Sequence, residues 1–174
     1  MSSESKTEAP RFIILPSDDA ADLYEPIDLP GGERGDSGTD LRFPESIMVP
    51  PSGPSGSALL VNLGVKCRCL VNVTPAPYMI ACRSSIGKTP LMLANSTGII
   101  DRGYTGNLMV RIRNLSNEPY KIERGKSLFQ LIRSDLEPAT LEIADAPTAE
   151  LFFGDGVTKR GAGGFGSTGE SGAK

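Results

Sequence analysis

Apolar and polar positions alternate most clearly between residues 61 and 69. The apolar phase consists of Val61, Leu63, Val65, Cys67 and Cys69, with Asn62, Gly64, Lys66 and Arg68 between them. A period of two predicts a strand with one buried face. The same alternation runs from Leu108 to Ile112, with Arg111 and Arg113 on the opposite phase. We therefore expect two half-buried strands, and we expect both cysteines to pack in the core.

Shorter apolar runs, each bounded by Gly, Pro, Asn or Asp, predict further short strands. They lie at Phe12–Leu15, Ile47–Val49, Pro77–Ala81, Leu128–Ile132 and Leu141–Ile143. Only residues 85–94 have room for a helical turn, and Pro90 interrupts them. The 20 glycines and 14 prolines also favour turns over long helices. This pattern predicts an all-β fold: a sandwich, a jelly roll or a distorted barrel.

The chain of 174 residues suits one domain with two terminal extensions. Residues 1–10 are rich in Ser, Glu and Lys, and we expect a disordered arm without the apolar stretch of a secretory signal. Residues 11–153 carry the strand patterns and form the β domain. Residues 154–174 are rich in glycine and poor in apolar side chains, so we expect a flexible segment.

Composition excludes several classes of function. The net charge of −3 offers no basic footprint for stable nucleic-acid binding, and no apolar run reaches membrane-spanning length. The three cysteines lack metal-ligand spacing and indicate reduced thiols in an intracellular protein, cytoplasmic or nuclear. The absence of histidine excludes Ser-His-Asp and Cys-His catalysis. A proton acceptor must therefore be Asp, Glu, Lys, Tyr or water.

Two segments have the composition of a phosphate site. Arg160–Gly169 (R-G-A-G-G-F-G-S-T-G) combines glycines with donors suited to phosphate oxygens, although a linker with one aromatic residue looks the same. Ala81–Ser85 (A-C-R-S-S) places Arg83 beside two hydroxyls at a strand end. Such a group is either a phosphate cradle or an ordinary polar turn.

A third segment, Asn95–Gly106 (N-S-T-G-I-I-D-R-G-Y-T-G), has glycines and polar residues at both ends. We expect a hairpin with Asp101 and Tyr104 near its turn. An aspartate at this place is either a turn former or a functional carboxylate beside the apolar Ile99 and Ile100.

In their order and spacing, these segments resemble the motifs of trimeric dUTPases. The five matching stretches are Ser37–Arg42 (S-G-T-D-L-R), Arg83–Gly87 (R-S-S-I-G), Asn95–Gly106, Arg124–Ile132 (R-G-K-S-L-F-Q-L-I) and Arg160–Gly169. The similarity extends over residues 36–169. It implies a distorted jelly-roll-like β-barrel of the β-clip type, assembled as a homotrimer with shared active sites and a C-terminal lid at 154–174. It also implies Mg²⁺-dependent hydrolysis of dUTP to dUMP and pyrophosphate, which limits uracil in DNA and supplies dUMP for dTMP synthesis.

The resemblance also implies a role for each matching residue. Asp101 is the general base that deprotonates the water attacking the α-phosphorus, and Asp40 supports the metal through water unless it is only a turn residue. The substrate-binding residues are Arg83, Ser84, Ser85, Asn95, Gly98, Ile100, Tyr104, Gln130, Arg160, Phe165, Gly166, Ser167 and Thr168. Among these, Phe165 would stack on uracil and Tyr104 would lie on the deoxyribose. The backbone of residues 95–106 would read the base.

The sequence departs from the family pattern at four places. Thr105 stands where arginine is usual, and Cys82 stands where a proline commonly precedes the second motif. Ile86–Gly87 replaces Leu-Ala, and Ser127–Phe129 replaces Arg-Ile-Ala. These changes bear on local packing and subunit contacts, and they leave the residues assigned to chemistry in place.

Two other functions fit part of the pattern. A dCTP deaminase resembles dUTPases in fold and in the R-S-S motif, but it lacks the F-G-S-T-G tail and has a catalytic Glu near the position of Asp101. A non-catalytic dUTPase-like module for binding or regulation would be expected to lose Asp101, Arg83 or the tail motif, and all three are present. Pyrophosphate release from dUTP, with ammonia release from dCTP as the control, separates the three functions.

Overall fold

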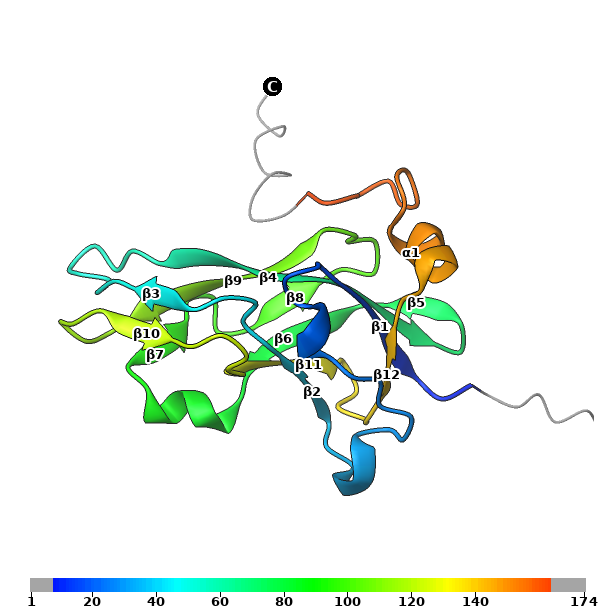
Figure 1. Ribbon diagram of the computed structural model, residues 1–174, viewed down its shortest axis with the longest axis horizontal. Helices are drawn as coiled ribbons and strands as arrows, with labels where there is room; N and C mark the ends of the chain where they lie inside the picture. The colour runs from blue at the N-terminus through cyan, green and yellow to red at the C-terminus, as the bar shows by residue number, and fades with distance from the viewer. Residues whose placement is uncertain (1–7, 164–174) are drawn as a thin grey trace, which may run out of the picture.

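The structure, a computed structural model, describes residues 8–163. Over these residues the chain is mostly β, with three sheets and little helix (Figure 1). The strands are β1 (Arg11–Pro16), β2 (Gly38–Leu41), β3 (Ile47–Val49), β4 (Leu59–Val71), β5 (Thr74–Ala76), β6 (Tyr78–Cys82), β7 (Leu91–Leu93), β8 (Gly98–Ile100), β9 (Asn107–Asn114), β10 (Tyr120–Ile122), β11 (Phe129–Arg133) and β12 (Thr140–Ile143). The helices are the 3-10 turns η1 (Ala21–Leu23), η2 (Gly32–Arg34) and η3 (Ser84–Lys88), and the α-helix α1 (Ala146–Phe153).

The largest sheet has the strand order β12-β1-β4-β9-β7, and β5 pairs with β4. A second sheet has the order β2-β11-β6-β8, and β3 pairs with β10 in a two-stranded ribbon. β1 and β12 run parallel, whereas the other named strand pairs are antiparallel. This arrangement confirms the expected all-β, jelly-roll-like fold.

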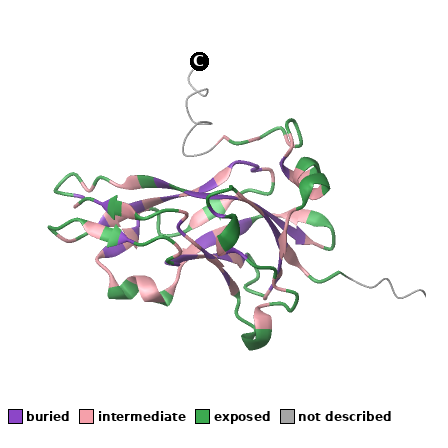
Figure 2. Ribbon diagram, in the orientation of Figure 1, coloured by how far each residue is buried: buried purple, intermediate pink, exposed green. Residues whose placement is uncertain are grey.

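The core lies between the two larger sheets, where Figure 2 shows the buried segments of the strands. Phe12 of β1 meets Tyr78 of β6 edge-on, with ring centroids 5.7 Å apart. The buried Tyr78 hydroxyl donates a 2.9 Å hydrogen bond to the Cys67 carbonyl of β4. Cys67 and Cys69 are buried in the core, as the alternation predicted. The sheets are therefore joined by side chains from β1, β4 and β6.

A bulge at Gly64 bends the long strand β4, and the sequence pattern did not reveal it. The pairing with β9 shifts register between Asn62 and Lys66. Gly64 has a φ of +62°, and a Cβ there would come within 2.9 Å of the Ser17 hydroxyl oxygen. Glycine therefore allows β4 to pair with β9 in its first half and with β1 in its second half.

The helix α1 was not expected from the sequence. Asp145 caps it by accepting a 2.9 Å hydrogen bond from the Thr148 amide, and Pro147 stands in the first turn. This cap lowers the pKa of the Asp145 carboxyl, since the bonds from Thr148 favour the charged form. The helical turn allowed within residues 85–94 is present as η3, and β7 follows it.

The hairpin expected at residues 95–106 is only partly correct. β7 and β9 are the antiparallel arms, and the Ala94 amide extends their pairing with a 2.8 Å hydrogen bond to the Arg111 carbonyl. Between the arms, β8 leaves this sheet and pairs with β6. Ser96 has a φ of +61°, which marks the turn that redirects the chain. The loop therefore connects two sheets instead of closing a simple hairpin.

No helix within residues 8–163 is both long and apolar enough to cross a membrane.

Candidate functional site

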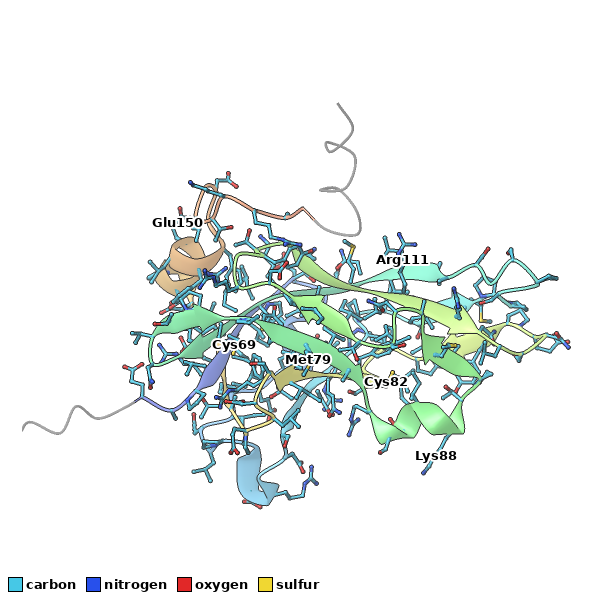
Figure 3. All side chains as sticks on the ribbon, turned by 180° about the vertical axis from the view of Figure 1, so that it is seen from behind. Cys69, Met79, Cys82, Lys88, Arg111 and Glu150 are labelled. Carbon is cyan, nitrogen blue, oxygen red and sulfur yellow. The ribbon has the colours of Figure 1, made fainter. Side chains whose placement is uncertain are left out.

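Strand β6, on which Figure 3 labels Met79 and Cys82, lies between the strands that carry the two clusters of expected site residues. On one side Ile80 lies opposite Gly98 of β8, and on the other Ala81 lies opposite Gln130 of β11. Arg83 follows directly after β6. The register of the sheet therefore fixes both clusters relative to one central strand.

The first cluster lines a polar cleft of about 820 Å³. Its lining residues are Ile27, Gly31, Gly32, Glu33, Arg34, Asp36, Ser37, Gly38, Thr39, Asp40, Arg42, Arg83, Ser84, Gln130 and Ile132. Three residues expected to bind substrate lie here, Arg83, Ser84 and Gln130, together with Asp40, which was expected to support the metal. We call this site the polar cleft.

An ion pair crosses the polar cleft between β2 and the end of β6. Arg83 Nε lies 2.9 Å from Asp40 Oδ1, and Arg42 lies 4.0 Å from the other Asp40 oxygen. Gln130 donates from its amide nitrogen to the Cys82 carbonyl at 3.3 Å. A Cβ at Gly38 would overlap the end of the Gln130 side chain, so glycine leaves room for the amide in its present position. The cleft thus carries both charge signs and a fixed amide.

Main-chain carbonyls of the segment before β11 hold the Arg83 region in place. The Arg83 amide donates to the Leu128 carbonyl at 2.9 Å, and its guanidinium donates to the Ser127 carbonyl at 3.3 Å. The Ser85 hydroxyl donates to the same Ser127 carbonyl, also at 3.3 Å. Because these acceptors are main-chain carbonyls, they do not depend on the side chain. The residues at 82, 127 and 128 can therefore differ from the family pattern without loss of these hydrogen bonds.

The second cluster lines a smaller pocket of about 220 Å³. Its lining residues are Ile80, Leu93, Asn95, Gly98, Ile99, Ile100, Asp101, Tyr104, Met109, Val110 and Arg160. Buried Ile80, Leu93 and Val110 make an apolar floor, whereas Asp101 and Arg160 are exposed polar residues. We call this site the small pocket.

Tyr104 is a buried part of the small pocket. Its hydroxyl donates a 2.6 Å hydrogen bond to the Asn107 carbonyl. A Cβ at Gly106 would come within 2.7 Å of the Tyr104 hydroxyl oxygen, so glycine at this position leaves space for the phenol ring. Burial raises the pKa of Tyr104, and the nearby Arg160 charge opposes this change only in part. The phenol is therefore uncharged at neutral pH.

The chain after α1 returns to the small pocket. Arg160 forms an ion pair with Asp101, whose side chain is 51% exposed. The Gly161 carbonyl accepts a 3.1 Å hydrogen bond from the Thr105 amide, and Gly161 forms a parallel bridge with Tyr104. The Asp101 carboxylate thus has the Arg160 guanidinium beside it, in addition to the apolar Ile99 and Ile100 that precede it in the chain.

The sequence-predicted site residues form two groups within the one chain. The small pocket includes Asn95, Gly98, Ile100, Asp101, Tyr104 and Arg160, and the polar cleft includes Asp40, Arg83, Ser84 and Gln130. Ser85 lies beside the cleft and bonds to the Ser127 carbonyl. Phe165, Gly166, Ser167 and Thr168 lie outside the described residues. The small pocket and the polar cleft share no lining residue.

Sequence reasoning missed the apolar floor of the small pocket. Ile80, Leu93, Met109 and Val110 line it, but they occur in ordinary strand patterns. Alternation shows which face of a strand is buried. It does not show that β7 and β9 of one sheet meet β6 and β8 of another at this point. Only the topology reveals that.

The described residues were also tested for a metal site. Within residues 8–163, no group of three or more His, Cys, Asp or Glu side chains is arranged to hold an ion. Asp40 is the carboxylate that pairs with Arg83 in the polar cleft, which Glu33 and Asp36 also line, and its second oxygen lies 4.0 Å from Arg42. This donor set fits an ion held mainly by phosphate oxygens, with Asp40 in support through water.

Sequence comparison identifies the family of this all-β chain. A sequence model of the dUTPase family matches residues 26–169. The deoxyuridine 5′-triphosphate nucleotidohydrolase of African swine fever virus (isolate Tick/South Africa/Pretoriuskop Pr4/1996) is 33% identical over 167 residues, which cover 94% of this chain and 97% of the viral protein. The enzyme of the same name from Polynucleobacter asymbioticus is 34% identical over 145 residues, which cover 80% of this chain and 87% of that protein. The chain belongs to the dUTPase family.

Solved structures agree on the fold. The dUTPase of Staphylococcus bacteriophage 80alpha has a TM-score of 0.53 and 20% identity, over 70% of this chain and 87% of the phage chain. A mutant dUTPase from phage phi11 of S. aureus, described with a structural Mg(II) ion, has a TM-score of 0.51 and 20% identity, over 72% of this chain and 89% of that chain. At this identity the likeness concerns the fold alone.

Proposed function

We propose that this chain hydrolyses dUTP to dUMP and pyrophosphate. The small pocket carries the proposal, because it sets an apolar floor beside an exposed aspartate in a member of the dUTPase family. Its volume of about 220 Å³ is below the roughly 300–1,000 Å³ of pockets that take drug-sized ligands, so it suits a small part of the substrate such as the nucleoside. In a cell this reaction would limit uracil in DNA and supply dUMP for dTMP synthesis.

The backbone of β8 is proposed to read the base. β8 is the edge strand of its sheet, so part of its amides and carbonyls face away from β6. Such groups can pair with uracil as a neighbouring strand would. Cytosine presents a donor where uracil presents an acceptor, and each unmet buried group costs about 1–3 kcal/mol. The buried Tyr104 would lie against the deoxyribose and exclude a 2′-hydroxyl.

Asp101 is proposed as the general base. Its carboxylate would accept a proton from a water molecule while the water oxygen bonds to the α-phosphorus. The bond from the α-phosphorus to the bridging α,β-oxygen breaks, and pyrophosphate leaves with that oxygen. The exposed position of Asp101 at the pocket rim gives water access to the carboxylate.

The polar cleft is proposed to hold the phosphate chain. Arg83 and Gln130 are oriented by main-chain carbonyls, and Ser84 is exposed beside them. Preorganised donors of this kind stabilise phosphate charge without reorganising during the reaction. Asp40 would support Mg²⁺ through water here, and the ion would supply positive charge to the phosphate oxygens during the reaction.

We propose a homotrimer in which one chain supplies the small pocket and another supplies the polar cleft. The two sites are separate within the described chain, and an apolar stripe that is half-buried at Ile132 and Met79 and exposed at Ile99 lies near both. Ile132, Met79 and Ile99 lie side by side across β11, β6 and β8, and Ile99 is 69% exposed. Figure 3 labels Met79 of β6. A second copy placed on this stripe would bury it.

The C-terminal residues 154–174 are proposed as the lid over bound nucleotide. Arg160 lines the small pocket already. Phe165 would stack on uracil, and Gly166, Ser167 and Thr168 would bind the γ-phosphate. We place this activity inside a cell, either in the cytoplasm or in the nucleus.

One nucleotide panel tests the function. Pyrophosphate release is measured from dUTP, dTTP, dCTP and UTP, each with and without EDTA, and ammonia release from dCTP is followed in parallel. We expect strong preference for dUTP and loss of activity with EDTA. Comparable rates on all four nucleotides would contradict the proposal. Ammonia from dCTP would instead indicate a deaminase, and dUTP binding without turnover would indicate a binding module.

A further inference from the structure

One hydroxyl group joins the C-terminal segment to the loop that carries Asp101. Thr158 Oγ1 donates a 2.5 Å hydrogen bond to the Gly103 carbonyl and accepts a 3.1 Å hydrogen bond from the Gly161 amide. The two residues it bonds, 103 and 161, are 58 positions apart in the chain. Thr158 precedes the fifth motif and matches none of the family's motifs. We call residues 158–161 the tail root.

A second contact aligns the tail root with the same loop. The Thr105 amide donates a 3.1 Å hydrogen bond to the Gly161 carbonyl, and Gly161 forms a parallel bridge with Tyr104. Gly161 has a φ of +57°, which glycine adopts without strain. The tail root is therefore held at two points, one on each side of Arg160.

This double attachment decides where Arg160 lies. The Arg160–Asp101 ion pair is part-exposed, with side-chain exposures of 39% and 51%. Exposed ion pairs contribute little on their own, because a long arginine loses much conformational entropy when it is fixed. Thr158 is a short β-branched side chain and is stiff about χ1. Its two hydrogen bonds are better suited than the ion pair to hold the backbone in place.

We propose that Thr158 is a positioning residue that anchors the tail root to the Gly103–Thr105 backbone of its own chain. Arg160 then reaches the Asp101 pocket in cis. The catalytic consequence rests on the proposed dUTP hydrolysis, whereas the anchoring itself does not. In the trimer proposed above, one chain would supply both the small pocket and the tail root of an active site, and another chain would supply its polar cleft.

A disulfide trap tests whether the tail root lies against Gly103 of its own chain. A Cβ built at Gly103 lies 4.0 Å from Thr158 Cβ, inside the range of roughly 3.5–4.5 Å found in disulfides. The double variant Gly103→Cys/Thr158→Cys, in a Cys82→Ser background, is oxidised and run on a denaturing gel without reductant. We expect an intrachain disulfide, seen as a faster monomer band that reverts on reduction. A disulfide between chains, or none at all, would overturn the proposal.

A matched pair controls for random oxidation. A Cβ at Gly87 has no atom within 4 Å, and Gly87 lies in the exposed η3. We expect Gly87→Cys/Thr158→Cys in the same background to remain reduced under the conditions that close the first pair. Intrachain closure of the control at the same rate would mean that Thr158 is not held at Gly103, and it would overturn the proposal.

Removing the hydroxyl tests the positioning role. Thr158→Val keeps the shape and loses both hydrogen bonds, Thr158→Ser keeps the hydroxyl, and Thr148→Val on α1 is the control. We expect faster amide exchange at Gly161 and Thr105 in Thr158→Val alone, with kcat/KM for dUTP lowered about tenfold and restored by serine. Unchanged exchange in Thr158→Val would refute the anchoring. If the exchange and the disulfide behave as expected but the parent chain does not hydrolyse dUTP, the proposed function fails and the anchoring stands.

Discussion

Asp101 and Arg160, 59 positions apart in the chain, form an ion pair at the rim of the small pocket. Asp101 follows β8, and Arg160 belongs to the segment that returns after α1. The guanidinium therefore occupies the space beside the carboxylate that we propose as the general base. We expect the phosphates of a bound nucleotide to offer Arg160 a stronger partner than Asp101, which would leave more of the carboxylate open to water.

The first prediction concerns Asp101. Asp101→Asn keeps the shape of the side chain but cannot accept a proton, so kcat should fall by about 10²–10⁴-fold. Binding of a non-hydrolysable dUTP analogue, measured by calorimetry, should largely survive. Asp18→Asn is the control, because Asp18 is exposed and lines neither site. Near-normal turnover of Asp101→Asn would place the base elsewhere.

The second prediction concerns Arg83 in the polar cleft. Arg83→Ala removes the guanidinium that bonds to the Ser127 carbonyl and pairs with Asp40. Loss of one charge-assisted phosphate contact costs about 1.5–3 kcal/mol, so kcat/KM for dUTP should fall roughly 10- to 150-fold. Steady-state kinetics at saturating Mg²⁺ measures this effect.

The matched control for Arg83 is Arg34→Ala. Arg34 lines the same cleft but is 84% exposed and pairs with Asp36. We expect less than a twofold change for this variant, because an exposed charge contributes little. Equal losses in both variants would mean that the cleft acts through its overall charge, and the specific role of Arg83 would be refuted.

The sequence predicted β1, β3, β4, β6, β9, β11 and β12, because burial follows a simple period, but it did not mark β2, β5, β7, β8 or β10. The alternation at residues 108–112 appears in β9, whereas in β4 the burial of Gly64 and Arg68 departs from the alternation at residues 61–69. The bend at Gly64 and the path of β8 could not be predicted. Both depend on contacts between segments distant in sequence, such as Gly64 with Ser17 and Gly98 with Ile80.

The site was predictable as a set of residues but not as an arrangement. The motif resemblance named Asp101, Arg83 and Arg160 without showing that they occupy two separate pockets. The helix α1 had a local signal in Asp145 and Pro147, but the glycine-rich composition just beyond it masked this signal. The contacts of Thr158 had no signal in the sequence, because a threonine in a glycine-rich segment is ordinary.

The third prediction is a loss of stability at alkaline pH. Burial raises the pKa of the Cys69 thiol from its usual 9.0 to about 11, and it also raises the pKa of Cys67. The unfolded chain releases these protons at lower pH than the folded chain. The thiol contribution to stability is therefore complete below pH 9 and is lost as pH rises toward 11.

Denaturant unfolding at pH 8, 9, 10 and 11 measures this loss. Cys69→Val keeps an apolar group of similar size and should reduce the alkaline fall in the free energy of unfolding. The control is Cys82→Ser, which should show the full fall, since Cys82 is only half-buried at the end of β6, where Figure 3 labels it. If both variants lose stability equally above pH 9, the cysteine explanation is wrong.

The last prediction concerns the C-terminal segment. Deleting Lys159–Lys174 removes the Arg160–Asp101 pair and the Gly161 contacts but leaves every strand of the two larger sheets. An exposed ion pair and two main-chain contacts contribute little to folding, so the melting temperature should change by only a few degrees. The loss of kcat/KM for dUTP should nevertheless be nearly complete, because closure excludes water and strengthens the charge interactions at the phosphates. Deleting residues 1–7 is the control and should leave activity intact.

A fluorescent reporter on the C-terminal segment gives a second test. The chain has no tryptophan, so Phe165→Trp adds one reporter, and a non-hydrolysable dUTP analogue should quench its fluorescence. A fully active truncated enzyme, or tryptophan fluorescence that does not change when the analogue is added, would show that the segment is only a linker.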